Sequence, residues 1–158
     1  ADLLATCAEI IGEDLPDDSG EDSVSNLRYW RGEGLDSPVR EATVHHSING
    51  SFSIRQGRWK LEMCPGSGGW SFPRPGPECE GLPPIQLYDL QADIGERTNL
   101  QDRHPEVVAE LRDLLTDSIR NGRSTTGEPQ ANFGDCHWKQ LWWMLADTQR
   151  KPQEPRRP

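Results

Sequence analysis

Apolar and polar residues alternate through residues 40–63, and this alternation predicts three short strands joined by two tight turns. Asn49-Gly50 marks the first turn, because a type I′ hairpin turn needs positive φ at both central residues. Gln56-Gly57 is a weaker signal of the same kind. β-Branched and aromatic residues, which suit strands, fill the flanking positions. We therefore expect an antiparallel meander here, with the rest of the chain wrapped around it.

Two-residue turns would fix which residues of the meander lie opposite one another. His45 would then pair with Ile54, and Ser47 with Phe52, so that one apolar face carries His45. The opposite face would hold mainly polar residues, but also Val44, His46 and Ile48. An apolar first strand on a face that is otherwise polar predicts that something covers that face.

Helical spacing of apolar residues predicts helices over residues 2–11 and 105–121, a shorter one over 22–31 and a last one over 137–145. Residues 85–90, IQLYDL, alternate and predict a fourth strand. The stretch 64–84 is too rich in Gly and Pro for regular structure, and a loop of this length is often functional.

Composition limits the classes of protein to which the chain can correspond. It has 158 residues, 33% of them hydrophobic, which predicts one modest core and at most a small second domain. The net charge of −9 argues against a nucleic-acid surface, because phosphate contacts need clustered Lys and Arg. No apolar run is long enough to span a bilayer. The four Cys residues form no C-x-x-C pair, so a zinc site is not expected and the redox compartment stays open.

Residues 87–100, LYDLQADIGERTNL, resemble the LYDL-x-x-DPGE-x-x-NL signature near the C-terminus of sulfatases, with Ile94 where the family usually has Pro. Further segments occur in the family's order: DLLATCAEIIG, IRQGRWKL and HPEVVAELRDLL. The resemblance covers roughly residues 2–130, and it is strongest to the arylsulfatase and N-acetylgalactosamine-sulfatase branches.

The resemblance implies an α+β fold, a small four-stranded antiparallel sheet packed with a C-terminal helix, as in the sulfatase C-terminal subdomain. It also implies that the alkaline-phosphatase-like catalytic domain is missing. Residues 1–32 would be a helical remnant of the end of the N-terminal domain, and residues 33–124 the C-terminal subdomain. Residues 125–158 would be a tail with a short Trp-rich helix and a disordered end. Sulfatases are often periplasmic, secreted or lysosomal, which leaves the localisation of this chain unknown.

Sulfatases hydrolyse sulfate esters with a formylglycine made in a C/S-x-P-x-R motif and with calcium. The sequence lacks that motif, so no catalytic or metal residue is expected here, and formylglycine and calcium are expected in the missing catalytic domain. The resemblance thus implies the C-terminal part of a sulfuric ester hydrolase, contributing to folding and to the rim of the substrate pocket but inactive alone. Its partners would be the missing N-terminal domain and a sulfated carbohydrate. The alternative is a free-standing carbohydrate-binding or interaction module.

His45 and His46 are the first candidates for substrate binding, because imidazole can bind a sulfate or a sugar hydroxyl. Neighbouring strand residues point to opposite faces, so at most one of the two can enter a given pocket. The other interpretation is a hydrogen-bonded core histidine beside a surface one.

The loop of residues 64–84 supplies the remaining candidates. Trp70 could be a platform for a sugar and Arg74 an anion contact, or the loop is solvated and its Trp fills a groove. Cys64 and Cys79 could form a disulfide, or both could be free thiols.

Elsewhere, the acidic side chains of the segment 89–96 are expected to build a turn, not a metal site. Three tryptophans are expected to pack against missing protein or a partner: Trp138, Trp142 and Trp143.

Overall fold

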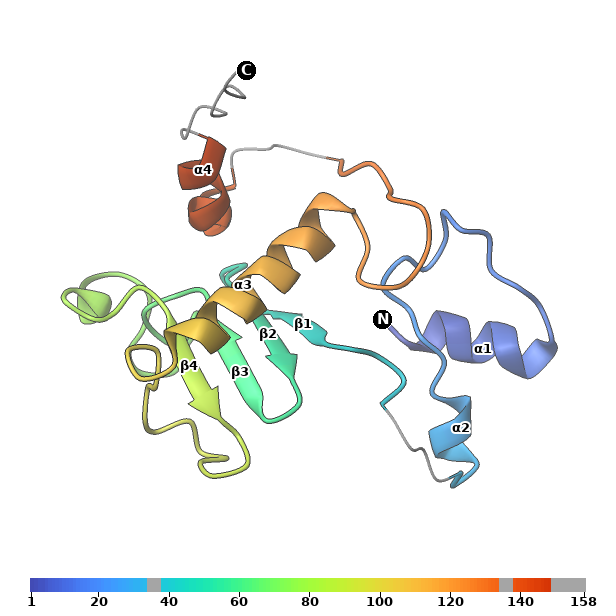
Figure 1. Ribbon diagram of the computed structural model, residues 1–158, viewed down its shortest axis with the longest axis horizontal. Helices are drawn as coiled ribbons and strands as arrows, with labels where there is room; N and C mark the ends of the chain where they lie inside the picture. Colours follow the sequence, from blue (N-terminus) through green and yellow to red (C-terminus); the bar gives the residue numbers. More distant parts are fainter. Residues whose placement is uncertain (34–37, 134–137, 149–158) are drawn as a thin grey trace, which may run out of the picture.

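The structure, a computed structural model, describes residues 1–33, 38–133 and 138–148. One four-stranded antiparallel sheet, in the order β1-β2-β3-β4, carries helix α3 on one face (Figure 1). The predicted α+β fold is therefore confirmed. The elements in chain order are α1 (Leu3–Ile11), α2 (Leu27–Trp30), β1 (Thr43–His46), β2 (Phe52–Gln56), β3 (Trp59–Glu62), η1 (Pro77–Cys79), β4 (Gln86–Asp89), α3 (Pro105–Arg120), η2 (Lys139–Leu141) and α4 (Trp142–Thr148).

The register of the meander differs from the predicted one by one residue. Val44 pairs with Ile54 and His46 with Phe52, because a three-residue loop joins the strands: Ser47 N donates to Ser51 O at 2.9 Å. A shift of one residue moves every side chain of a strand to the other face. The prediction that His45 shares the apolar face is therefore wrong, as is the prediction of an apolar second face that needs a cover.

The second turn also lies one residue further along than predicted. Gln56 pairs with Trp59, so the two turn residues are Gly57 and Arg58, and Gly57 has the positive φ of 55° that such a turn requires. Ile54 consequently pairs with Leu61, which brings two fully buried side chains together on the face under α3.

The core lies between that face of the sheet and α3. Pro105 begins the helix, where its missing N–H costs nothing, and apolar residues recur along one side. Val108, Leu111 and Leu115 pack against Ile54 and Leu87. The opposite side of α3 carries exposed polar residues, among them Glu110, Arg112, Asp113 and Asp117, so the predicted amphipathic helix is confirmed.

Helix α4 completes the core from the C-terminal side. Trp143 is 6% exposed, its ring meets that of Phe52 edge-on at 5.9 Å, and its Nε1 donates to Thr116 Oγ1 at 3.0 Å. Trp142 Nε1 donates to Met63 O at 3.2 Å. The prediction that the tryptophans pack against missing protein or a partner is thus wrong for Trp143, which packs against its own chain. The predicted disordered end falls outside the described residues.

The N-terminal helices lie to one side of the sheet (Figure 1). The predicted helix over 22–31 forms only as the single turn of α2. The backbone before α2 is bonded to the N-terminal helix region instead: Val24 N donates to Asp2 Oδ1, and Asn26 N donates to Thr6 Oγ1. No helix among the described residues is long and apolar enough to cross a membrane.

A buried arginine ties this N-terminal region to the segment after α3. The Arg123 guanidinium donates to Asp17 Oδ1 at 3.0 Å and to the carbonyl oxygens of Thr126 and Glu128. The Arg123 side chain is 7% exposed and that of Asp17 is 50% exposed, so salt screens this ion pair less than one between two exposed side chains.

Candidate functional site

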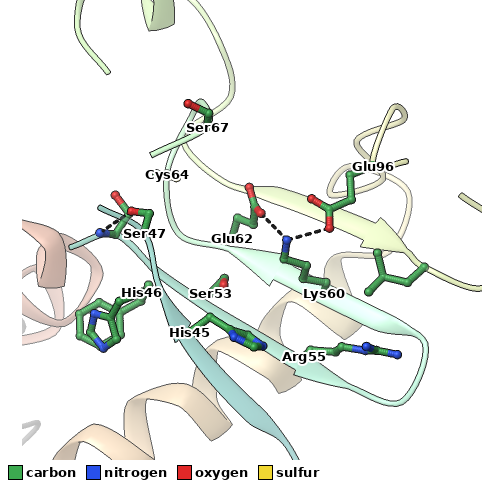
Figure 2. Close-up of a pocket in the computed structure, with 13 residues that line it drawn as sticks. His45, His46, Ser47, Ser53, Arg55, Lys60, Glu62, Cys64, Ser67 and Glu96 are labelled. Atoms are coloured by element: carbon green, nitrogen blue, oxygen red, sulfur yellow. Dashed lines mark hydrogen bonds and ion pairs between the residues drawn. The ribbon is translucent and has the colours of Figure 1, made fainter. Parts of the chain in front are cut away.

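The face of the sheet opposite α3 carries a polar pocket of about 430 Å³ (Figure 2). Its floor consists of side chains at alternate strand positions, which share one face because the strand repeat is two residues. These are His45 on β1, Ser53 and Arg55 on β2, and Lys60 and Glu62 on β3.

His45 and Arg55 place a hydrogen-bonding ring and a cation on the floor of the pocket. Partial burial and the positive charges of Lys60, Arg55 and Arg40 lower the pKa of His45, so its imidazole is neutral at pH 7 and can both donate and accept a hydrogen bond. Arg55 is exposed, and it takes part in none of the ion pairs between described residues. Its Nε donates to Gly57 O at 3.3 Å. The pair therefore suits an anion that carries a neighbouring hydroxyl group.

Lys60 is engaged within the pocket wall. Its Nζ lies 2.8 Å from Glu62 Oε1 and 2.7 Å from Glu96 Oε1. Dashed lines mark these two ion pairs in Figure 2. Burial acts to lower the pKa of Lys60, but the two carboxylates outweigh it and raise that pKa. Burial and the same negative charges raise the pKa of Tyr88, which lies opposite Lys60 on β4, to about 12. Lys60 thus keeps its proton, and its charge is compensated by two carboxylates. Arg55 is therefore the cation of the pocket floor that a ligand can pair with.

His46 faces the other way. It pairs with Phe52 on the α3 side of the sheet, and the two rings lie 4.0 Å apart between centroids. The structure therefore separates the two predicted histidines: His45 is on the polar floor and His46 packs beside the core at the edge of the pocket. Their roles in substrate binding stay predictions.

The rim of the pocket is a tightly bonded junction between the β1–β2 loop and the loop of residues 64–84. Asn49 Oδ1 accepts hydrogen bonds from the Ser47 hydroxyl at 2.7 Å and from the Ser51 N–H at 3.0 Å. Asn49 N donates to Gly68 O at 3.2 Å. Gly68 has φ of 63°, and a Cβ there would lie 2.6 Å from Ser47 Oγ, so only glycine allows the two loops to approach this closely.

Trp70 and Arg74 lie beyond this junction. Trp70 is 85% exposed, so the interpretation in which its ring fills a groove of this chain is wrong. The Arg74 guanidinium donates to Glu78 Oε1 at 2.7 Å, and this interaction lowers the pKa of Glu78. Arg74 already has a carboxylate partner, which leaves Trp70 as the more available of the two predicted contacts.

Cys64 and Cys79 are both thiols in the structure and both lie against Gly66. Cys64 Sγ contacts Gly66 O at 3.2 Å, and a Cβ on Gly66 would lie 2.5 Å from Cys79 Sγ. Burial raises the pKa of Cys64, so it is protonated at pH 7. Their pairing as a disulfide stays a prediction.

Arg55, Lys60 and Glu96 belong to this pocket, although the sequence pattern does not single them out. The sequence places Arg55 and Lys60 on the mainly polar face, which it predicts to be covered, and Glu96 in a turn. The alternation of Arg55 and Lys60 with apolar residues along β2 and β3 is visible in the sequence. Only the three-residue β1–β2 loop, however, puts His45 on the same face of the sheet. Two side chains of the LYDL…NL segment are structural: Asp93 Oδ2 accepts from two backbone N–H groups, and Asn99 Oδ1 accepts from Leu87 N.

No group of three or more His, Cys, Asp or Glu side chains in the described part of the chain could hold a metal ion.

Comparisons with known proteins identify similar chains, although no protein-family model matches. The chain is 34% identical over 117 residues to an N-acetylgalactosamine-6-O-sulfatase of Bacteroides thetaiotaomicron, over 72% of this chain and 22% of that protein. A structure from work on glycosaminoglycan metabolism by Bacteroides thetaiotaomicron matches with a TM-score of 0.58 and 31% identity, over 73% of this chain and 24% of that one.

A third protein, solved in complex with its substrate D-glucosamine-2-N,6-O-disulfate, shares the fold with a TM-score of 0.52 at 20% identity, over 74% of this chain and 23% of that one. The chain thus spans about a quarter of the length of the proteins that it matches.

Proposed function

We propose that the chain is the C-terminal part of a sulfatase, as the LYDL…NL segment predicted, and that it forms one side of the pocket that holds a sulfated carbohydrate. In this proposal the chain contributes to folding of the whole protein and to the pocket rim. In this proposal the chain supplies neither the nucleophile nor the ligands of the metal ion.

The polar pocket opposite α3 carries this proposal. Arg55 offers a cation without an ion-pair partner among the described residues, and neutral His45 offers both a donor and an acceptor. A sulfate group needs cationic and N–H donors, and a sugar hydroxyl is satisfied by a neutral imidazole. We assign Arg55 to the sulfate or a sugar carboxylate and His45 to a neighbouring hydroxyl.

The cofactors of the reaction belong, in this proposal, to the rest of the parent protein. The sequence has no C/S-x-P-x-R motif for formylglycine, and the described residues bring no carboxylate cluster together that suits calcium, which takes six to eight oxygen ligands. The chain alone is therefore expected to show no turnover of an aryl sulfate in the presence of calcium.

The test is a hybrid in which this chain replaces the matching part of the Bacteroides thetaiotaomicron N-acetylgalactosamine-6-O-sulfatase. Arg55→Ala is expected to lower kcat/KM on a 6-sulfated sugar by roughly 10- to 100-fold, since a charged hydrogen bond contributes about 1.5–3 kcal/mol. Arg112→Ala is the matched control, because Arg112 is exposed on α3 and pairs with Asp113. Equal activity of the two variants would overturn the assignment.

A direct binding measurement keeps the proposal testable if the hybrid does not fold. N-acetylgalactosamine 6-sulfate is titrated into the 158-residue chain while the His45 ring resonances are followed by NMR. Shifts with the sulfated sugar and none with unsulfated N-acetylgalactosamine support the pocket. Equal shifts with both sugars contradict it. Binding by the chain together with an inactive hybrid would favour the free-standing carbohydrate-binding module.

A further inference from the structure

We propose that Trp70, together with Phe72 two residues further along the same loop and Ile48 against the preceding Gly69, forms a second sugar-binding surface that adjoins the polar pocket, so that the chain recognises a sulfated oligosaccharide and not a single sugar. This inference rests on the proposed function of the pocket and specifies its substrate class. These three residues are called the aromatic platform below.

The aromatic platform consists of large apolar side chains that the chain does not bury. Trp70 is 85% exposed, Phe72 80% and Ile48 68%. Such grouped apolar exposure on a protein surface typically marks a binding site. Ile48 joins the other two because its Cγ2 lies 3.2 Å from the Cβ position of Gly69, the residue before Trp70.

The loop that presents the aromatic platform is braced on both sides of Trp70. Ser67 N donates to Pro73 O at 2.9 Å, and the Ser67 hydroxyl donates to Ser71 O at 2.7 Å. At its base, Gln86 Nε2 donates to Cys64 O at 2.8 Å and to Gly66 O at 3.1 Å. A braced loop loses little conformational entropy when a ligand binds, so the aromatic rings are held ready for contact.

The position of the aromatic platform favours a carbohydrate as its occupant. Ser47 and Ser67 line the polar pocket, and the platform begins one residue beyond Ser47 and three residues beyond Ser67 along the two loops. A saccharide whose sulfated unit lies in the pocket would therefore extend its next unit over Trp70. A pyranose ring has an apolar face that packs on an indole, whose large flat surface suits such contacts.

The experiment measures binding of three probes to the 158-residue chain by calorimetry: N-acetylgalactosamine 6-sulfate, a chondroitin 6-sulfate tetrasaccharide and the desulfated tetrasaccharide. The wild-type chain is expected to bind the sulfated tetrasaccharide roughly three- to tenfold more tightly than the sulfated monosaccharide. Trp70→Ala is expected to abolish this advantage of length and to leave the affinity for the monosaccharide unchanged.

Trp30→Ala is the matched control, because Trp30 on α2 is also exposed and does not line the polar pocket. The platform is overturned if Trp70→Ala keeps the length ratio, if Trp30→Ala lowers it equally, or if the tetrasaccharide shows no binding. Equal binding of the sulfated and desulfated tetrasaccharides, with a length ratio that still depends on Trp70, would instead overturn the polar pocket and support the platform.

Discussion

Replacement of Trp143 by Ala is expected to destabilise the chain by about 3–5 kcal/mol, the usual cost of removing a buried tryptophan from a core. Trp143 is 6% exposed, and its loss opens a cavity beside Phe52 and removes the hydrogen bond to Thr116 Oγ1. Domains of this size are typically stable by about 5–15 kcal/mol, so the variant would lose a large share of its stability.

A graded series separates burial from the hydrogen bond. Trp143→Phe keeps most of the ring and loses the N–H donor, and it is expected to cost about 1–2 kcal/mol. Trp142→Ala, at a half-exposed position that donates to Met63 O, is expected to cost about 1 kcal/mol. Trp138→Ala, at a site that is 50% exposed, is expected to change stability by less than about 0.5 kcal/mol.

The assay is urea unfolding followed by far-UV circular dichroism, which does not depend on the number of tryptophans. Equal m-values across the series are required before the midpoints are compared as free energies. A Trp143→Ala variant within about 1 kcal/mol of the wild type, or no less stable than Trp138→Ala, would refute the packing of α4 into the core.

Three further predictions concern the site. NMR titration of the free chain is expected to give His45 a pKa below 6.5, so its contribution to the free energy of unfolding is fully present above about pH 6.5 and is lost as the pH falls through the lower pKa of the folded state; a measured value at or above 6.5 contradicts this. Lys60→Met is expected to cost roughly 1–3 kcal/mol at pH 7 by chemical denaturation, because it removes the ion pairs with Glu62 and Glu96; a cost below about 0.5 kcal/mol speaks against the network. Gly68→Ala is expected to cost at least about 2 kcal/mol, because its Cβ would meet Ser47, whereas Gly57→Ala, also at positive φ but with nothing near its Cβ, is expected to cost about 1 kcal/mol; equal costs contradict the close approach of the two loops.

Local patterns in the sequence predicted the strands and the main helices, because hydrophobic periodicity and turn residues act over short distances. The register was not predictable in this way. Asn49-Gly50 indicates a turn, but the three-residue loop depends on Asn49 Oδ1, which accepts three hydrogen bonds from the serines on either side. That choice of loop length decided which histidine faces the polar pocket.

The tryptophans near the C-terminus show a second limit of the sequence. Their spacing predicts a helix with an apolar side, but spacing does not tell which surface that side will meet. Trp143 finds its partner Thr116 on α3, 27 residues earlier in the chain. Amphipathic patterns therefore predict that a face is buried, and only the tertiary structure shows against what.

Helix α4 also bears on the order in which the chain folds. Trp142 bonds to a carbonyl 79 residues earlier, and Gln140 Nε2 donates to Asn49 O, 91 residues earlier, at 2.5 Å. Contacts of such sequence separation form slowly, since the intervening chain must first be closed into a loop. During synthesis the four strands and α3 can assemble, and the β1–β2 loop can bond to Gly68, before residues 138–143 have left the ribosome. The rim of the pocket is thus expected to gain its contact with Gln140 only after the rest of the sheet has formed.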